Sequence, residues 1–343
     1  MYNDKTFIDF LKKVSPGAPL RTVIDDLIKA ELGALIVFDN PEIQPIIKGG
    51  FRINSRFTAQ RIFELCKMDG AIIVSPDLKR ILYSNVLLAP DSSISTNETG
   101  TRHMAGERTA KQANTFVIAV SERRKKTTLY YQNHKYILRS SDGILRDVSS
   151  TLQVLEKQRE LFDDLLSKLN ILEMSELVSV SDVCKVIQRA EIIVKTSETL
   201  KKDFTELGKE GNIMNMRYKE LLRGIERTEE KIIRDYSNFS LNKTQTLLSN
   251  INVEGLLDLD TISRIIFEKN IEETIPTRGF RFLSHLPLNE KEISDIVNRF
   301  SSLAEIFKTT PEHLGELFGA RAENIIKEIE NLREQILSGK VLT

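Results

Sequence analysis

A long stretch without helix-breaking residues is the feature that most constrains this chain. Neither glycine nor proline occurs from Ile144 to Leu207, and no proline occurs between Asp91 and Ile275. Within this stretch, leucine and phenylalanine recur at spacings of three and four residues, which is the period of a helix with one apolar face. The pattern predicts long helices that pack into a bundle or spine over residues 146–275.

The residues before this stretch follow a different pattern. An amphipathic segment and an apolar run fill residues 20–37, and two short apolar runs flank the Pro-Asp turn at residues 76–77. Residues 116–121 and the alternating residues 127–138, with a turn at 132–134, add three more predicted strands. Helices interspersed with such strands are typical of α/β proteins. We predict a mixed sheet covered by helices over residues 1–145.

Turn residues return after Ile275. Pro276 is followed by several short amphipathic segments that are separated by tight turns. Thr310 is a good helix N-cap, and Pro311 suits the first helical position. The fold class predicted for the whole chain is therefore multidomain α/β plus all-α, with a small all-helical module over residues 276–343.

The composition indicates a globular protein of the cytoplasm. Hydrophobic residues make up 41% of the chain and charged residues 29%. No apolar run approaches the roughly 20 residues that span a bilayer, and the first residues carry mixed charge, unlike a signal peptide. The sequence thus predicts no membrane partner. Cys66 and Cys184 lie far apart and outside any CxxC pattern, which favours a reducing compartment over a disulfide or zinc site.

The charge is distributed unevenly although its sum is zero. Residues 1–150 contain 22 Lys and Arg against 16 Asp and Glu, and ten of these cations lie between Arg102 and Arg146. Residues 276–343 contain 9 Lys and Arg against 10 Asp and Glu. An anionic ligand is therefore expected in the N-terminal part, whereas the C-terminal part lacks the basic surplus of a strong nucleic-acid binder.

Three short segments could carry chemistry. Asp69-Gly70-Ala71 places a carboxylate before a predicted strand, where it could hold Mg²⁺ or Mn²⁺ or accept a proton. Gly100 predicts a flexible loop in which Thr101, Arg102 and His103 supply donors to polyphosphate oxygens. Ser121 precedes a basic run, Arg123 to Lys126, which could steer an anion or simply face solvent. Walker, GxGxxG, HExxH and GxSxG motifs are absent, so the common phosphate-loop, dinucleotide, zincin and hydrolase sites have no support.

Together these segments resemble the DNA integrity scanning diadenylate cyclases. The resemblance covers residues 49–103, then ERTAKQ at 107–112 and VIAVSERR at 117–124, and it continues through the helical middle to the C-terminal region. It implies a cyclase domain at 1–145, a helical linker at 146–275 and a helix-hairpin-helix, DNA-binding-like module at 276–343. The implied reaction condenses two ATP molecules into cyclic di-AMP and two pyrophosphates, coupled to sensing of DNA structure.

The resemblance also implies roles for individual residues. Asp69, Arg102 and His103 would be catalytic, and Asp69 would hold Mg²⁺ or Mn²⁺ near the attacking 3′ hydroxyl. The nucleotide-binding residues would be Gly70, Ala71, Leu88, Thr101, Arg102, His103, Met104, Ala105 and Ser121. The implied assembly is a homo-oligomer, an octamer, in which two cyclase domains face each other and each presents one ATP. Branched DNA is an implied partner, with Arg278, Arg281 and Arg321 as weak phosphate contacts.

Two departures from the family pattern keep alternatives open. Members usually have arginine and threonine where this chain has Met104 and Ala105, which favours a degenerate nucleotide-binding scaffold. The second C-terminal hairpin usually reads Gly-apolar-Gly, but Leu317 replaces its first glycine and Glu323 stands where a small residue is usual. A protein that mainly binds DNA structures is the other alternative, and this degraded hairpin disfavours it.

Overall fold

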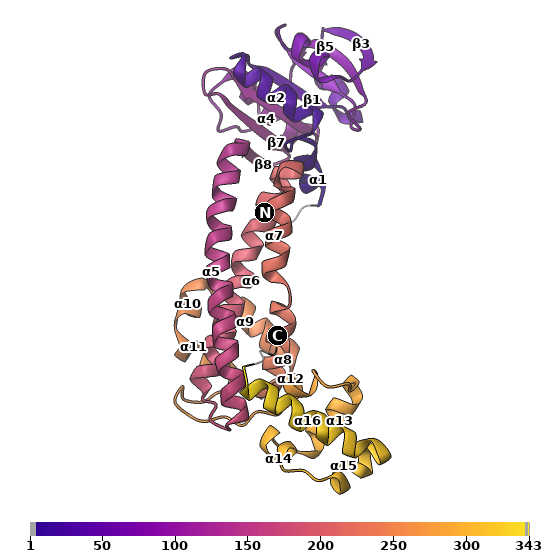
Figure 1. Ribbon diagram of the computed structural model, residues 1–343. Coiled ribbons are helices and arrows are strands. Elements are labelled where there is room, and N and C mark those ends of the chain that lie inside the picture. Colours follow the sequence, from indigo (N-terminus) through magenta and orange to yellow (C-terminus); the bar gives the residue numbers. More distant parts are fainter. Residues whose placement is uncertain (1–4, 340–341, 343) are drawn as a thin grey trace. The chain divides into compact units, whose positions relative to one another are not determined.

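The computed structural model describes residues 5–339 and 342. The chain divides into two compact units, the first made of Met1–Val148 with Lys202–Ile213 and the second of Ser149–Lys201 with Met214–Thr343. The boundaries between the units fall within three helices, α5 (Ser141–Met174), α6 (Val180–Leu207) and the beginning of α7 (Asn212–Leu222) (Figure 1). Each unit has a hydrophobic core of its own.

The first unit is built on an eight-stranded mixed sheet, as predicted. Its strands are β1 (Ala34–Phe38), β2 (Ile47–Lys48), β3 (Phe51–Arg56), β4 (Ala71–Val74), β5 (Arg80–Leu88), β6 (Phe116–Ser121), β7 (Lys126–Tyr131) and β8 (His134–Leu138). They lie in the order β2-β5-β4-β1-β6-β7-β8, with β3 also paired to β5. Only β1 and β4 run parallel among these pairs, and the others are antiparallel.

Helices cover both faces of this sheet because its central strands are apolar on both sides. The helices are α1 (Lys5–Lys13), α2 (Pro19–Lys29), α3 (Ala59–Leu65) and α4 (Thr101–Gln112). In β1, Ile36 faces the cluster formed with α1, α2 and α3, whereas Leu35 faces the cluster that includes Ala110 of α4. This alternation places α4, together with the short 3-10 helix η1 (Pro41–Ile46), on the face that carries the site described below.

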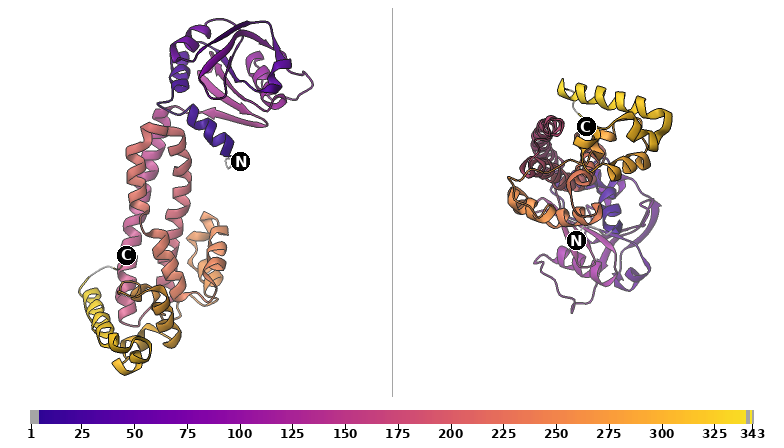
Figure 2. Two further views of the ribbon diagram at one scale, coloured as in Figure 1. Left: turned by 90° about the vertical axis from the view of Figure 1, so that its right-hand side faces the viewer. Right: turned by 90° about the horizontal axis from the view of Figure 1, so that it is seen from below.

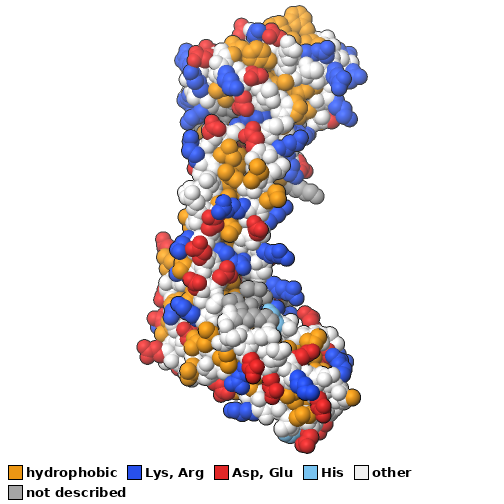
Figure 3. All heavy atoms as spheres, in the orientation of Figure 1, with side chains coloured by type: hydrophobic (Ala, Val, Ile, Leu, Met, Phe, Trp, Pro, Cys, Tyr) orange, Lys and Arg blue, Asp and Glu red, His pale blue; other side chains and the backbone are white. Residues whose placement is uncertain are grey.

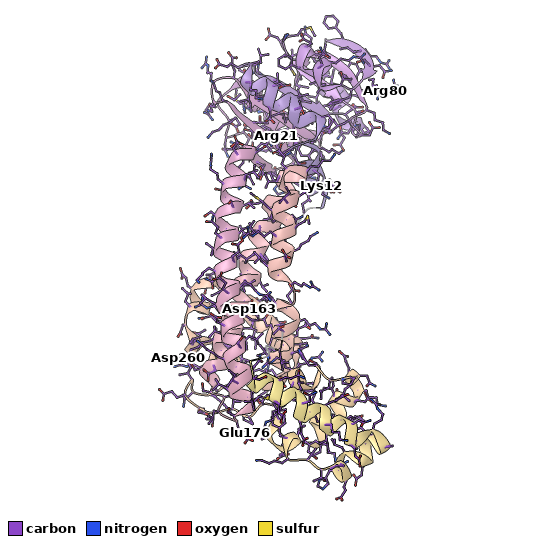
Figure 4. The ribbon with its side chains drawn as sticks, in the orientation of Figure 1. Lys12, Arg21, Arg80, Asp163, Glu176 and Asp260 are labelled. Atoms are coloured by element: carbon purple, nitrogen blue, oxygen red, sulfur yellow. The ribbon has the colours of Figure 1, made fainter. Side chains whose placement is uncertain are left out.

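A buried arginine joins α2 to the end of the sheet. Arg21, labelled in Figure 4, lies on the buried face of α2 and donates from Nε to Asp25 at 3.0 Å. Its Nη2 donates to the main-chain oxygen of Arg139 at 3.1 Å, just after β8. A charged group buried in this way is tolerated because it is paired and hydrogen-bonded.

The second unit is helical throughout its described length, as the long stretch without helix breakers predicts. After the main parts of α5 and α6 it contains α7 (Asn212–Leu222), α8 (Ile225–Tyr236), α9 (Leu241–Asn250), α10 (Val253–Leu257), α11 (Leu259–Ile266), α12 (Phe280–Leu283), α13 (Glu290–Arg299), α14 (Leu303–Phe307), α15 (Pro311–Phe318) and α16 (Ala322–Leu337). Helices α7 and α8 follow one another end to end and run alongside α5 and α6 (Figure 1, Figure 2). Arg189 of α6 donates to Gln158 of α5 at 2.9 Å, and the Tyr218 hydroxyl of α7 donates to the main chain at Ser197 at 3.2 Å.

The last five helices enclose a separate apolar cluster. Leu283, Ile296, Leu303, Leu314 and Ile329 are among its buried members. Helix α15 begins at Pro311 after Thr310, as predicted, although the threonine side chain makes no capping hydrogen bond. Acidic and basic side chains are interspersed on the visible face of these helices (Figure 3). Throughout residues 5–339 and 342, every helix is too short or too polar to cross a membrane.

Candidate functional site

The first unit carries a pocket of about 730 Å³. Five separate segments of the chain contribute to it, including the start of β4 and the neighbouring end of β5, the start of α4 and the turn between β6 and β7. Its lining residues are Leu35, Gly70, Ala71, Val86, Leu87, Leu88, Glu98, Thr99, Gly100, Thr101, Arg102, His103, Ala105, Ser121, Glu122, Arg123 and Arg124. The three short segments that the sequence singled out are therefore brought together.

One expectation about these segments is wrong in its local structure. Thr101, Arg102 and His103 do not lie in a flexible loop but form the first turn of α4, which follows Gly100 in extended conformation. The first main-chain N–H groups of a helix lack intrahelical acceptors, and the helix dipole adds positive potential there. No acidic residue stands in this first turn. Both the main-chain N–H groups and the side chains of this turn are therefore suited to bind an anion.

The Asp69-Gly70-Ala71 segment forms the turn into β4. Gly70 has a φ of 90°, and a Cβ there would lie 2.9 Å from the main-chain carbon of Asn85, so only glycine fits. Gly70 and Ala71 line the pocket, whereas Asp69 is exposed and lies outside the lining. The carboxylate is thus next to the pocket in the chain and free to turn toward a ligand that enters it.

The other predicted residues divide into two groups. Leu88 at the end of β5, Ala105 of α4 and Ser121 at the end of β6 line the pocket. Met104 is half-buried and is not part of the lining. Met104 stands where the family pattern has a second arginine. It differs from Arg102, His103 and Ala105 in that these three neighbours line the pocket and Met104 does not.

The basic run after Ser121 contributes two cations. Arg123 and Arg124 lie in the turn between β6 and β7 and line the pocket, and the Ser121 hydroxyl accepts a hydrogen bond from the main chain of Arg124 at 3.2 Å. Lys125 instead pairs with Glu31 at 2.6 Å. The run is thus partly a wall of the site and partly a surface ion pair.

Arg102 depends on the absence of a side chain at Gly33. A Cβ at Gly33 would lie 1.9 Å from the Arg102 Nη1 atom, so the guanidinium occupies the space that any other residue would fill. The positive charge also reaches Cys66, where it opposes the burial that raises the pKa of that thiol to about 12. Gly33 therefore sets where the guanidinium of Arg102 can lie.

The surroundings of His103 favour its neutral form. Burial lowers the pKa of His103, and although the Glu98 carboxylate opposes this, the positive charges of Arg102, Arg124 and Lys135 reinforce it. The pKa stays below its ordinary value, so the ring is mostly uncharged at neutral pH. A phosphate group bound beside the ring would favour the protonated form, which donates from both nitrogens.

Glu98 is a feature of the site that sequence reasoning missed. Its carboxylate accepts a hydrogen bond from the Tyr130 hydroxyl at 2.8 Å and pairs with Lys135. Burial alone would raise the pKa of Glu98, but these two hydrogen bonds outweigh it and hold the pKa below its ordinary value. The Tyr130 ring lies edge-on to His103, with 6.4 Å between centroids. The pairing joins residues 32 apart in the chain, and no local pattern signals it.

The donors available suit a metal that arrives with a phosphate ligand. The part of the chain that the structure describes contains no group of three or more His, Cys, Asp and Glu side chains able to hold a metal by themselves. Mg²⁺ usually takes one or two protein carboxylates and completes its shell with water and substrate phosphates. Asp69 beside a pocket lined by Arg102 and His103 fits this arrangement.

Comparison with known proteins identifies the family. A family model described as "DisA bacterial checkpoint controller nucleotide-binding" matches residues 21–135, and one described as its linker region matches residues 138–273. The DNA integrity scanning protein DisA of Clostridium botulinum (strain Loch Maree / Type A3) is 37% identical over 348 residues, covering 98% of this chain and 99% of the relative. The chain belongs to the DisA family.

Other DisA relatives and two solved structures are similar to this chain. DisA of Clostridium perfringens (strain SM101 / Type A) is 38% identical over 99% of each chain. Among solved structures, a double mutant of DacA from Staphylococcus aureus is 22% identical with a TM-score of 0.32, covering 40% of this chain and 91% of DacA. A hypothetical membrane spanning protein from Bacillus cereus is 25% identical with the same TM-score, covering 36% and 62%. The DisA family match places the pocket within its nucleotide-binding region.

The three arginines predicted to contact DNA in this DisA chain lie in different environments. Arg281 is 1% exposed, and its guanidinium is bound by Glu173 and Asn170. The prediction that it contacts a DNA phosphate is wrong for this conformation, because the group is buried and paired. Arg278 is half-buried and donates to main-chain oxygens of Arg234 and Ser237, and Arg321 is exposed beside Glu292 at 2.9 Å.

Proposed function

We propose that this chain is a diadenylate cyclase that condenses two ATP molecules into cyclic di-AMP and two pyrophosphates. The observation that carries the proposal is the convergence of Gly70, the first turn of α4 and Ser121 on one pocket in a DisA nucleotide-binding region. An α-helix N-terminus with Arg102 and His103 suits a triphosphate, and the apolar Leu88 suits the adenosine.

In the proposed reaction, the 3′ hydroxyl of one ATP attacks the α-phosphorus of the other. The 3′ hydroxyl loses its proton to solvent, a bond forms between the 3′ oxygen and the α-phosphorus, the bond to the oxygen bridging the α- and β-phosphates breaks, and pyrophosphate leaves. The same exchange on the opposite side closes the ring. Positioning and charge neutralisation dominate phosphoryl transfer, so the work of Arg102, His103 and the α4 N-terminus is to hold and neutralise the triphosphate. Mg²⁺ or Mn²⁺ held by Asp69 would add positive charge at the same phosphates.

The ring chemistry requires two sites, so assembly belongs to the proposal. One pocket presents one ATP, and a second ATP must face it from another copy of the domain. We therefore propose a homo-oligomer of cytoplasmic chains, with the octamer implied by the resemblance, in which pairs of first units face each other. Sedimentation of the full chain with and without an ATP analogue measures this assembly.

Incubating the purified chain with ATP and Mn²⁺ and analysing the products by liquid chromatography with mass spectrometry tests the function. We expect cyclic di-AMP and pyrophosphate in a ratio of one to two. With 3′-deoxy-ATP, which lacks the attacking hydroxyl, no ring should form. ATP binding without any product would favour the second candidate, a nucleotide-binding scaffold, which Met104 and Ala105 support by departing from the family pattern.

Replacing Gly33 with alanine should weaken ATP handling without weakening the fold. The φ of Gly33 is not positive, so alanine suits the main chain there, but its Cβ would collide with the Arg102 guanidinium. Displacing one charge-assisted hydrogen bond to a phosphate corresponds to about a 10- to 150-fold loss. We expect a loss in kcat/KM within this range, with an unchanged melting temperature. Alanine at half-buried Gly315, where a Cβ would meet nothing within 4 Å, is the control.

DNA binding is expected to be weak. Residues 276–343 carry one more acidic than basic residue, and of the three candidate arginines only Arg321 is exposed. Few phosphate contacts give a shallow dependence of affinity on salt. Fluorescence anisotropy of labelled branched DNA, measured from about 50 to 200 mM salt, should show this. Tight binding with a steep loss on adding salt would contradict the expectation.

A further inference from the structure

A second group of cations lies on helix α8, apart from the site described above. Arg227, Lys231 and Arg234 are spaced by four and three residues, which puts them on one stripe of this helix. The opposite stripe is buried in the second unit and includes Ile225 and Ile232. Three like charges on one stripe repel each other, so this arrangement destabilises the fold unless a bound anion compensates the charges.

These cations border a pocket of about 170 Å³ within the second unit. The pocket is closed on its other sides by Phe280, Leu288 and Ile293, which give it an apolar wall. Two acidic residues, Glu230 and Glu290, also line it. The site is therefore a small hollow with an apolar side and an excess of positive charge.

The three cationic side chains form no ion pair in the part of the chain that the structure describes. Among those residues, the side chains of Arg227, Lys231 and Arg234 also make no hydrogen bond, and the Glu230 carboxylate instead accepts one from Gln245. Arg234 takes part in a hydrogen bond only through its main-chain oxygen, which accepts from Arg278. Burial lowers the pKa of Lys231, the charges of Arg227 and Arg281 act in the same direction, and the opposing charge of Asp235 does not outweigh them. A half-buried lysine beside like charges is an unfavourable arrangement that a bound anion would relieve.

The chemistry of the three cations indicates which anion the pocket can bind. Arginine offers a planar fork that matches phosphate oxygens, and lysine adds a compact charge. An apolar wall beside the cations can accept the carbon part of the molecule that bears the phosphate. We propose that this pocket binds a phosphate group, carried either by a small phosphorylated molecule or by a nucleic-acid backbone.

The test compares a double variant, Lys231→Gln with Arg234→Gln, with a control that removes the same charge elsewhere. Lys219→Gln with Lys327→Gln serves as the control, because both lysines are exposed in the second unit and lie outside the pocket. Neither pair belongs to the proposed cyclase site, so cyclic di-AMP synthesis should be unchanged in both. Equilibrium dialysis of the full chain with labelled pyrophosphate counts the sites per chain and gives their affinities.

We expect the wild type and the control to show one more pyrophosphate site per chain than the double variant. If the double variant keeps this site, its affinity for pyrophosphate there should be at least about tenfold weaker. Without pyrophosphate the double variant should melt no lower than wild type, because it loses repulsion and no ion pair. Identical pyrophosphate binding in the variant and wild type would overturn the proposal. If the double variant does not fold, Arg234→Gln alone serves, since Arg234 is exposed.

A duplex DNA probe distinguishes the two sources of the phosphate. If the double variant loses affinity for DNA beyond the control, and the slope of log affinity against log salt becomes shallower, the site takes a backbone phosphate. If DNA binding matches the control while the pyrophosphate site is lost, the ligand is a small molecule. Equal losses of DNA binding in variant and control, with pyrophosphate binding intact, would show only general electrostatics and would overturn the proposal.

Discussion

Replacing Asp69 with asparagine is expected to lower the rate of cyclic di-AMP formation by at least about 100-fold. Asparagine has almost the same shape as aspartate but lacks the charge that would hold Mg²⁺ or Mn²⁺. Asp69 is exposed and lies outside the packed core, so the fold should be unaffected. Initial rates with Mn²⁺ and ATP measure the effect, and a melting curve checks the fold.

The matched control for this change is Asp26→Asn. Asp26 is an exposed carboxylate on α2 of the same unit, outside the pocket lining, so its loss should change the rate less than about twofold. ATP binding measured without metal should survive in the Asp69 variant, because the α4 N-terminus, Arg102 and His103 remain. A rate within severalfold of wild type would show that Asp69 is not catalytic. The Asp69-Gly70-Ala71 segment would then serve only to form the turn at Gly70.

The sheet was predictable because its strands carry their own signals. The central strands β1, β4 and β6 are buried on both faces and read as continuous apolar runs. Burial alternates along β8, as it does in a half-covered strand. Helix α4 was not predicted, since it packs through small residues. Gly106, Ala110 and Thr109 are buried, and a Cβ at Gly106 would already lie 3.1 Å from Leu35. A helix that lies this close to a sheet lacks the large apolar residues from which a helical period is recognised.

The candidate site was predictable where its residues are consecutive and unpredictable where the fold pairs distant ones. Gly70, Thr101, Arg102 and His103 stand in short segments whose turn chemistry and donors are visible in the sequence. The space left by Gly33 for Arg102, and the pairing of Glu98 with Tyr130, join segments whose proximity is created by the sheet order. Counting charges along the chain has the same limit, because it treats a buried arginine and an exposed one alike.

Arg281 is the case where this limit matters most, and replacing it with alanine should destabilise the second unit by about 3–5 kcal/mol. Its guanidinium bonds Glu173 and Asn170 of α5 while fully buried, and the Tyr236 hydroxyl also donates to Glu173. Removing the cation leaves the Glu173 carboxylate buried without its counter-charge. Urea unfolding followed by helical circular dichroism, with hydrogen exchange of α12 to locate the change, measures the loss.

Two further variants separate a buried pair from a surface charge. Arg321→Ala removes an exposed cation paired with Glu292 and should cost no more than about 1 kcal/mol. Arg281→Met with Glu173→Gln removes both charges while keeping volume and an acceptor for Tyr236, so it should recover part of the stability lost in Arg281→Ala. A cost for Arg281→Ala below about 1 kcal/mol would mean that water reaches the pair. In that case Arg281 would be open to a DNA phosphate, and Arg281→Ala would lower the affinity for DNA while costing little stability.

If the burial is as described, Arg281→Ala should lose affinity for DNA only as far as the structure around α12 is lost. The double variant should then show no loss of DNA binding.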